Sequence, residues 1–199
     1  YKNLTGHFDC TFTGKGISYG GSLVRKEATG YGLVYLTEKM LESVNTSIKG
    51  KTIAISGSGN VAIYAAEKAV QLGAKVVTMS DSNGYIYDPN GIDVNTVKVI
   101  KEQRRERIKE YVRYYDTARY FENGLVWSVP CDIALPCATQ NELTSEGAEC
   151  LVKNGCIAVA EGSNMSTTID AVEILHENNI MYVPGKASNA GGVAVSALE

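Results

Sequence analysis

Three small residues, Gly57-Ser58-Gly59, stand between a short apolar run and a helical pattern, a combination that can bind phosphate. The run at 52–56 is apolar and rich in β-formers, as in a buried parallel strand. Gly57 permits a tight turn, and Gly59 lets the backbone approach a pyrophosphate. The N–H groups and the positive dipole end of the next helix would face that anion. The alternative is a glycine turn without a ligand in an ordinary α/β protein.

The surroundings of this turn favour a dinucleotide over that alternative. A helical pattern spans 60–72, a second apolar strand follows, and Asp81 ends that strand about twenty residues after the turn. Ala62 takes the third small position of the fingerprint, which still permits close packing of helix on strand. We therefore expect a dinucleotide site at Gly57 to Gly59.

Alternating strands and helices must position this turn. We expect a Rossmann-like, doubly wound α/β fold, with a mostly parallel sheet and helices on both faces, whose polar loops meet at the carboxyl edge. Helical patterns cover 27–44, 60–72, 94–115, 144–153 and 167–177, and a small-residue helical pattern begins at 185. Strand patterns cover 52–56, a run ending at 81, 131–135, 156–160 and 180–183, with a short extended piece at 85–87.

The composition excludes several classes of protein. The 199 residues are 44% hydrophobic and 21% charged, enough for one sizeable core. The net charge of −3 without a long basic run predicts no nucleic-acid partner, and no apolar segment is long enough to predict a membrane partner. The five cysteines form no CxxC pair, which indicates reduced thiols in a cytoplasmic protein. His7 and His176 lack ligand-like neighbours, so no metal site is expected.

Both ends of the chain predict a piece of a longer protein. Residues 1–21 contain no methionine, little periodicity and several glycines, and the helical pattern at 185–199 stops without a cap. We therefore expect 1–21 to connect from a preceding domain. Residues 22–199 would form a nucleotide-binding domain without its last helices.

Four motifs in one order carry a family resemblance. They are GGSLVRKEATGYG at 20–32, SGSGNVA at 56–62, PCATQN at 136–141 and KASNAGGV at 186–193. Together they resemble the hexameric glutamate dehydrogenases, within the superfamily that also acts on leucine, phenylalanine and valine. The match runs from end to end of the chain but covers only the cofactor-binding half of such an enzyme. The resemblance implies that the substrate domain, with its catalytic lysines and aspartate, precedes Tyr1, and that further helices follow Glu199.

The resemblance also implies residue roles. On the cofactor side, Arg25 and Thr29 would hold the nicotinamide carboxamide, Ser58, Gly59, Asn60 and Val61 the pyrophosphate, and Ala138, Thr139 and Asn164 the ribose and nicotinamide. On the substrate side it places Thr13, Asn189, Val193 and Ser196, with Ser196 donating to the distal carboxylate of glutamate. Without the motifs, Thr13 and Thr29 would be ordinary hydroxyls and Ser196 a small helix residue.

The choice between NADP and NAD depends on the end of the second strand. Asp81 would ordinarily accept hydrogen bonds from the ribose 2′-hydroxyl of NAD. However, Ser80-Asp81-Ser82 resembles the NADP-using members of the family. Cations that could reach a 2′-phosphate follow at Lys101, Arg104, Arg105 and Arg107. The alternative for this cluster is a solvated helix face, but its i,i+4 pairs are like-charged and would not stabilise a helix. We expect NADP, with NAD as the alternative.

The implied reaction is the oxidation of glutamate to 2-oxoglutarate and ammonia, or its reverse, by hydride transfer at the nicotinamide. Because the proton chemistry belongs to the preceding domain, we expect this chain to bind cofactor without turnover. The full-length protein would be a homo-oligomer. Two alternatives stay open. One is a branched-chain or aromatic amino-acid dehydrogenase, against which Ser196 argues. The other is a stand-alone nucleotide-sensing module, in which the motif at 189–196 would be surplus.

Overall fold

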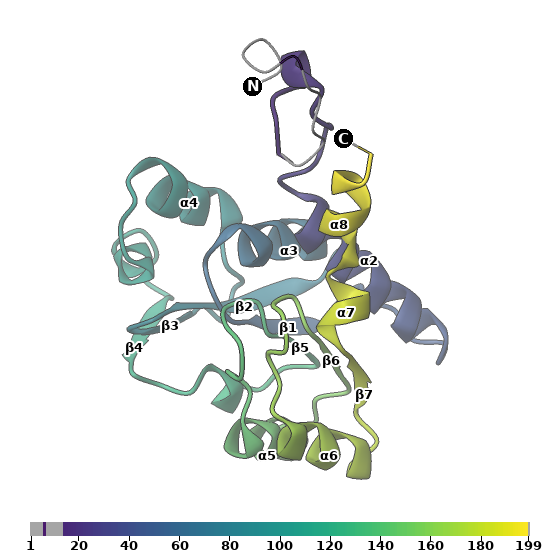
Figure 1. The fold of residues 1–199 in the computed structure, drawn as a ribbon. Helices are drawn as coiled ribbons and strands as arrows, with labels where there is room; N and C mark the ends of the chain where they lie inside the picture. The colour runs from purple at the N-terminus through teal and green to yellow at the C-terminus, as the bar shows by residue number, and fades with distance from the viewer. Residues whose placement is uncertain (1–5, 7–13, 199) are drawn as a thin grey trace.

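The computed structural model describes Gly6 and residues 14–198, in which seven strands form one sheet (Figure 1). The spatial order is β4-β3-β2-β1-β5-β6-β7. The strands are β1 (Thr52–Ile55), β2 (Lys75–Asp81), β3 (Gly84–Tyr87), β4 (Arg119–Glu122), β5 (Ile133–Leu135), β6 (Ala158–Ala160) and β7 (Met181–Val183). The pairs β1–β2, β1–β5, β5–β6 and β6–β7 are parallel. The pairs β2–β3 and β3–β4, at one edge of the sheet, are antiparallel. The expected doubly wound, mostly parallel sheet is confirmed.

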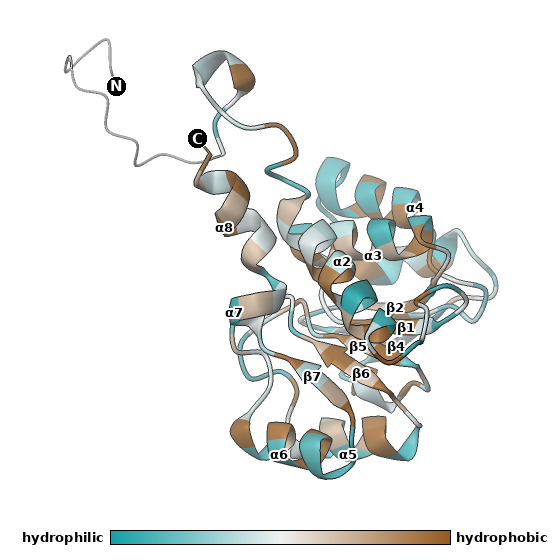
Figure 2. Cartoon of the chain, turned by 90° about the vertical axis from the view of Figure 1, so that its right-hand side faces the viewer, coloured by the Kyte–Doolittle hydropathy of each residue, from teal (hydrophilic) through white to brown (hydrophobic). Residues whose placement is uncertain are grey.

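Helices cover both faces of this sheet (Figures 1 and 2). α2 and α3 lie on one face, and α5 and α6 lie on the other. The helices are α2 (Ala28–Glu42), α3 (Asn60–Gln71), α4 (Val94–Lys98), α5 (Ser145–Lys153), α6 (Ile169–Glu177), α7 (Gly185–Ser188) and α8 (Ala190–Ser196). The 3₁₀-helices are η1 (Ile17–Tyr19), η3 (Ile108–Arg113) and η4 (Val126–Ser128), and η2 (Val99–Gln103) is a π-helix. None of the helices in the described residues is long and apolar enough to cross a bilayer.

The two core layers follow from the alternation of side chains along the strands. Ile53 and Ile55 of β1 are fully buried in the cluster under α2 and α3, whereas Ala54 between them joins the cluster around Trp127 on the other face. Because successive strand residues point to opposite faces, a continuous apolar strand must be covered on both sides. The hydrophobic strands in the middle layer of Figure 2 are consistent with this requirement.

The order of the parallel strands defines where a ligand can bind. Starting from β2, the order runs through β1 to β5, β6 and β7, so the chain winds in opposite directions on the two sides of the β1–β5 pair. In sheets of this kind the crevice lies outside the carboxyl ends of the strands at that switch point. The loops after β1, β5 and β6 therefore meet at one edge.

The expected single helix at 94–115 is wrong. α4 ends at Lys98, π-helical η2 follows, and Arg105 adopts a left-handed backbone with a φ of 55° before 3₁₀-helical η3 begins. The left-handed residue interrupts the helix and lets Ile108 and Tyr111, both fully buried, reach the core. If the helix were continuous, the exposed charged residues 104–107 would lie on the axis of α4, without the break that precedes η3.

Two smaller differences concern the sheet edge and the carboxyl end. β4 was not predicted from the sequence. Three of its four residues are exposed, so the strand lacks the alternation of buried and exposed positions by which a half-buried strand is recognised. It pairs antiparallel with β3 at the edge of the sheet, where Tyr85 and Phe121 stack with ring centroids 4.9 Å apart. The helical pattern from 185 divides into α7 and α8 at Asn189.

Candidate functional site

A cavity of about 490 Å³ opens at the carboxyl ends of β1, β5 and β6. Its walls come from segments far apart in the chain: the start of α2, the start of α3, the loops after β5 and β6, and α8. Residues predicted from the sequence line much of it: Arg25, Thr29, Val61, Ala138, Thr139, Asn164, Asn189 and Val193. The fold thus brings these positions to one cavity at the switch point.

Gly57 is fixed by contacts within the protein. Its φ is +82°, and a Cβ atom there would lie 2.9 Å from the carbonyl oxygen of Cys137. The Gly57 N–H donates to Ser80 Oγ at 2.7 Å, and the Ser80 N–H donates back to the Gly57 carbonyl at 3.1 Å. The glycine therefore lets the loops after β1 and β5 touch, and Ser80 holds the turn instead of facing the cavity.

Gly59 differs, because a Cβ atom there would meet nothing within 4 Å. It is the N-cap of α3, and no side chain caps the helix. The space beside Gly59 is therefore open at the N-terminus of α3, where the first amide N–H groups and the positive dipole end favour an anion. Ser58 is buried within the turn, and Asn60 Nδ2 donates to the Lys26 carbonyl at 2.6 Å, which ties α3 to the start of α2.

The carboxylate of Asp81 is bound to backbone groups. Oδ1 accepts from the Asn83 N–H at 2.9 Å and Oδ2 from the Ile108 N–H at 3.0 Å. Its side chain is only 7% exposed. Asp81 therefore anchors the segment before η3 against the end of β2. This role was not foreseen from the sequence.

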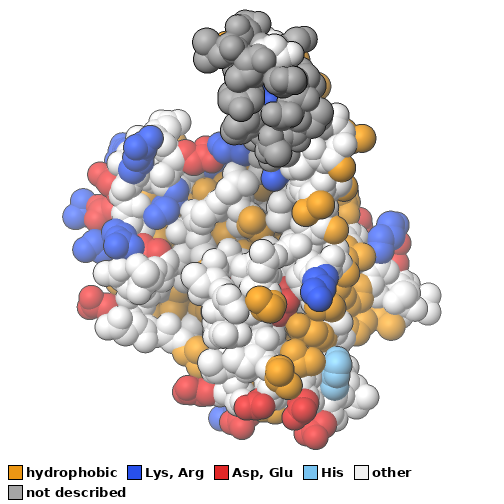
Figure 3. Space-filling model, viewed as in Figure 1, with side chains coloured by type: hydrophobic (Ala, Val, Ile, Leu, Met, Phe, Trp, Pro, Cys, Tyr) orange, Lys and Arg blue, Asp and Glu red, His pale blue; other side chains and the backbone are white. Residues whose placement is uncertain are grey.

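Arg107 is the predicted cation that lies beside this strand end. Its Nη1 donates to Ser82 Oγ at 2.8 Å and lies 4.0 Å from Asp81 Oδ2. Lys101 instead donates to the Glu106 carbonyl at 3.1 Å, and Arg105 is exposed. Lys and Arg side chains gather over α4 and the segment after it on the left of Figure 3. Of these three cations, Arg107 is therefore the one that an anion bound at Ser82 would contact.

Predicted substrate-side residues contact predicted cofactor-side residues. Arg25 Nε donates to Ser196 Oγ at 2.5 Å, and Asn189 Nδ2 donates to Asn164 Oδ1 at 2.7 Å. Val193 is largely exposed on α8, while Thr13 lies outside the described residues. The start of α2 and the loop after β6 are thereby joined to the segment that contains α7 and α8.

Close packing of α8 on α2 depends on paired glycines. A Cβ atom on Gly191 would lie 2.3 Å from the Ala28 carbonyl oxygen, and one on Gly192 would lie 2.2 Å from Thr29 Oγ1. Only glycine permits this approach, which sets Ser196 against Arg25.

Two glutamates that sequence reasoning missed shape the loops of the cavity. Glu142 Oε1 accepts from the N–H groups of Ala138 (2.9 Å) and Thr139 (3.2 Å), and burial raises the pKa of Glu142. Glu161 is buried and joins the loop after β6 to α7, accepting from Gly185 N–H at 2.7 Å. The position of Glu161 directly after an apolar strand was the available sequence signal.

The sheet order, the glycine turn that precedes α3 and the cavity at the switch point define an α/β domain of the doubly wound, Rossmann-like class. The model of the Glutamate/Leucine/Phenylalanine/Valine dehydrogenase family matches residues 20–199, and the chain belongs to this family. The resemblance found in the four motifs is confirmed.

Individual relatives agree with this assignment. The chain is 54% identical to a glutamate dehydrogenase of Bacteroides thetaiotaomicron, covering 100% of this chain and 45% of that protein. It is 54% identical to an NADP-specific glutamate dehydrogenase of Helicobacter pylori, covering 100% and 46%. The crystal structure of Plasmodium falciparum glutamate dehydrogenase superposes with a TM-score of 0.95 at 50% identity, covering 100% of this chain and 43% of that one. The chain spans less than half the length of these relatives.

Proposed function

We propose that this chain is the cofactor-binding part of an NADP-dependent glutamate dehydrogenase. The observation that supports this most is the cavity at the switch point, which is lined by residues of all four family motifs. A relative at 54% identity is NADP-specific. Residues 22–199 would form the nucleotide-binding domain, and 1–21 would connect it to a substrate domain.

The residues around the cavity fit NADP(H). The pyrophosphate would lie in the open space beside Gly59, where Gly59, Asn60 and Val61 would bind it through backbone N–H groups. Arg25, Thr29, Ala138, Thr139 and Asn164 would hold the nicotinamide and its ribose.

The 2′-phosphate would bind at Ser82 and Arg107. Because the Asp81 carboxylate accepts two backbone N–H groups, it is not presented to a ribose hydroxyl. The Arg107 side chain is 54% exposed, and its guanidinium could make a charge-assisted hydrogen bond to a phosphate while it offsets the charge of Asp81.

When bound, NADP⁺ supplies the acceptor for the hydride that glutamate loses on oxidation to 2-oxoglutarate and ammonia. The residues of this chain would hold glutamate and the nicotinamide ring at the distance and orientation that hydride transfer requires. Arg25 donates to the hydroxyl of Ser196, which would in turn donate to the distal carboxylate of the substrate, and Asn189 and Val193 would lie on the same side. Thr13, which the resemblance also assigns to the substrate, lies outside the described residues. Proton transfer would need the lysines and aspartate of the substrate domain. The chain alone would therefore bind cofactor without turnover, and the whole enzyme would be a homo-oligomer.

A titration with NADPH and with NADH, followed by nicotinamide fluorescence, tests this proposal. We expect NADPH to bind more tightly, and Arg107→Ala to weaken NADPH by about tenfold while leaving NADH unchanged, because one charged hydrogen bond is lost. Arg113→Ala is the matched control, since Arg113 is exposed and pairs with Glu110. Tighter binding of NADH, or an equal effect of Arg107→Ala on both nucleotides, would contradict the NADP assignment.

A further inference from the structure

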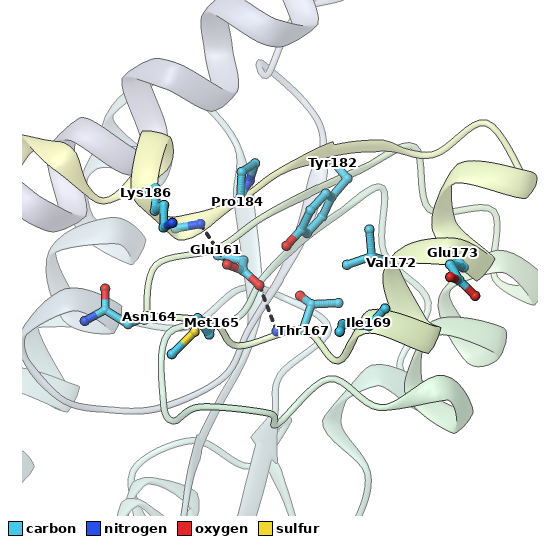
Figure 4. A pocket seen from close by; sticks show the side chains of 11 residues that line it. Glu161, Asn164, Met165, Thr167, Ile169, Val172, Glu173, Tyr182, Pro184 and Lys186 are labelled. Atoms are coloured by element: carbon cyan, nitrogen blue, oxygen red, sulfur yellow. Dashed lines mark hydrogen bonds between the residues drawn. The ribbon is translucent and has the colours of Figure 1, made fainter.

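One carboxylate joins the two ends of the loop after β6. Residues 162–164 of this loop line the cavity at the switch point. Glu161 directly precedes them and is only 2% exposed. Its Oε1 accepts from the Thr167 N–H at 2.7 Å (Figure 4). The Glu161 side chain therefore closes the segment that contains residues 162–164.

The same residue also binds the start of α7, the short helix that precedes Asn189. Glu161 Oε2 accepts from the N–H of Gly185, the first residue of α7, at 2.7 Å. The Glu161 carbonyl accepts from Ser188 Oγ at 2.5 Å. A Cβ atom on Gly185 would lie 2.8 Å from the Ser163 carbonyl oxygen, so α7 packs directly on the loop. Glu161 is thus bonded to both partners of this contact.

These bonds determine where Asn164 meets Asn189. The Asn189 N–H donates to the Gly185 carbonyl at 2.9 Å, so the position of Gly185 sets that of Asn189. Asn189 Nδ2 in turn donates to Asn164 Oδ1 at 2.7 Å, and both residues line the cavity at the switch point. Glu161 lies behind them, against a further cavity of about 630 Å³ that Figure 4 shows.

A carboxylate suits this place better than a neutral side chain of the same size. Each of its oxygens accepts from a different backbone N–H group, and hydrogen bonds to a charged acceptor are the stronger kind. Burial and a hydrogen bond to the same carboxylate raise the pKa of Tyr182, which keeps its hydroxyl protonated as a third donor. Glutamine would have only one oxygen, and its amide N–H groups would face a backbone N–H.

We propose that Glu161 is a positioning residue, whose carboxylate sets Asn164 against Asn189 and so places the nicotinamide end of the cofactor beside the substrate-side segment. This inference rests on the proposed function. The adenosine end would be unaffected, because the 2′-phosphate position at Ser82 follows β2, which β1 and β5 separate from β6 in the sheet. Loss of the carboxylate should therefore weaken only ligands that contain the nicotinamide.

Isothermal titration calorimetry of the 199-residue chain with NADPH and with adenosine 2′,5′-bisphosphate, which lacks the nicotinamide, tests this role. We expect Glu161→Gln to weaken NADPH binding by about tenfold and bisphosphate binding by less than about twofold, since one backbone N–H loses its acceptor. Glu173→Gln, the same change at an exposed position of α6, should alter neither affinity. An equal loss for both ligands in folded Glu161→Gln, or unchanged NADPH affinity, would overturn the inference. A wild-type chain that binds neither ligand would instead refute the proposed function.

A second variant decides the question if Glu161→Gln does not fold. Asn189→Ala removes the half-buried side chain through which Glu161 would act on Asn164. It should also weaken NADPH binding by about tenfold and leave bisphosphate binding unchanged. With both substitutions, the NADPH loss should match the larger single loss instead of the product of the two, because each change releases Asn164. Wild-type NADPH affinity in Asn189→Ala, or independent losses in the double variant, would overturn the inference.

Discussion

Gly57 and Gly59 are two residues apart, yet they meet different requirements. Gly57 has a positive φ and touches the loop after β5, so its lack of a side chain is needed for the fold itself. Gly59 has ordinary extended backbone and open space around its missing Cβ, so the described residues give no structural reason for a glycine there. The reason for Gly59 lies instead in the ligand that we propose.

Substitution of Gly57 tests the close contact of the two loops. Gly57→Ala should destabilise the chain by about 3 kcal/mol, because left-handed strain adds to a steric clash with Cys137. Gly50→Ala is the control, since Gly50 has a φ of 79° but nothing within 4 Å of its Cβ position, so only the strain of about 1 kcal/mol applies. Urea denaturation of both variants measures the difference. Equal losses would show that the loop contact is unimportant.

Glu67 joins three helices through its carboxylate. Tyr31 of α2 donates to Oε1 at 2.5 Å, and Lys98 of α4 donates to Oε2. Burial opposes ionisation of Glu67, but these hydrogen bonds outweigh it and lower the pKa of Glu67. The hydrogen bond to Glu67 also raises the pKa of Tyr31 to about 12.

The lowered pKa of Glu67 gives a pH dependence of defined sign. Because the pKa is lower in the folded state, the stabilisation is complete above the ordinary glutamate value of about 4.3 and is lost as the pH falls through the folded value. Glu67→Gln should therefore cost about 1 kcal/mol at pH 7 and progressively less below about pH 4. Urea denaturation of Glu67→Gln and the wild type, at pH 7 and again below about pH 4, measures the difference in their free energies of unfolding. A cost that stays constant with pH would contradict this explanation.

At the scale of elements, the segment from α4 to η3 departs most from the sequence prediction. Its apolar residues recur with helical spacing, yet the helix is interrupted at Arg105, whose φ is 55°. The causes are tertiary: the Ile108 N–H donates to Asp81, and the Asp93 N–H donates to the hydroxyl of buried Tyr111 at 2.8 Å. Periodicity within one segment cannot reveal such contacts, so this break could not be predicted.

Asp93 holds α4 in place as its N-cap. Its Oδ1 accepts from the Asn95 N–H at 2.9 Å, and its Oδ2 accepts from the Tyr115 hydroxyl at 2.5 Å. Asp93→Ala should cost about 2 kcal/mol, since the cap and the link to Tyr115 are both lost. Asn95→Ala on the exposed side of the same helix should change stability by less than about 0.5 kcal/mol. Thermal unfolding distinguishes the two, and comparable losses would exclude a special role for Asp93.

Across the whole molecule, the repeated order of strand, polar loop and helix was sufficient to predict the fold. It was also sufficient to predict that the loops after β1, β5 and β6 share one edge, where Val61, Ala138 and Asn164 now line one cavity. The pairing of Arg25 with Ser196 could not be predicted, because it depends on the close packing of α8 on α2.

The most direct test of the central claim, that NADP(H) binds before α3, is NADPH affinity in Gly59→Asp. Aspartate is a better N-cap than glycine, so the folded state should be as stable as the wild type or slightly more so. Its carboxylate would occupy and repel the pyrophosphate position, and we expect NADPH binding to fall at least about 100-fold. Gly59→Asn is the uncharged control and should bind NADPH more tightly than Gly59→Asp. Wild-type affinity in Gly59→Asp would contradict the proposed site.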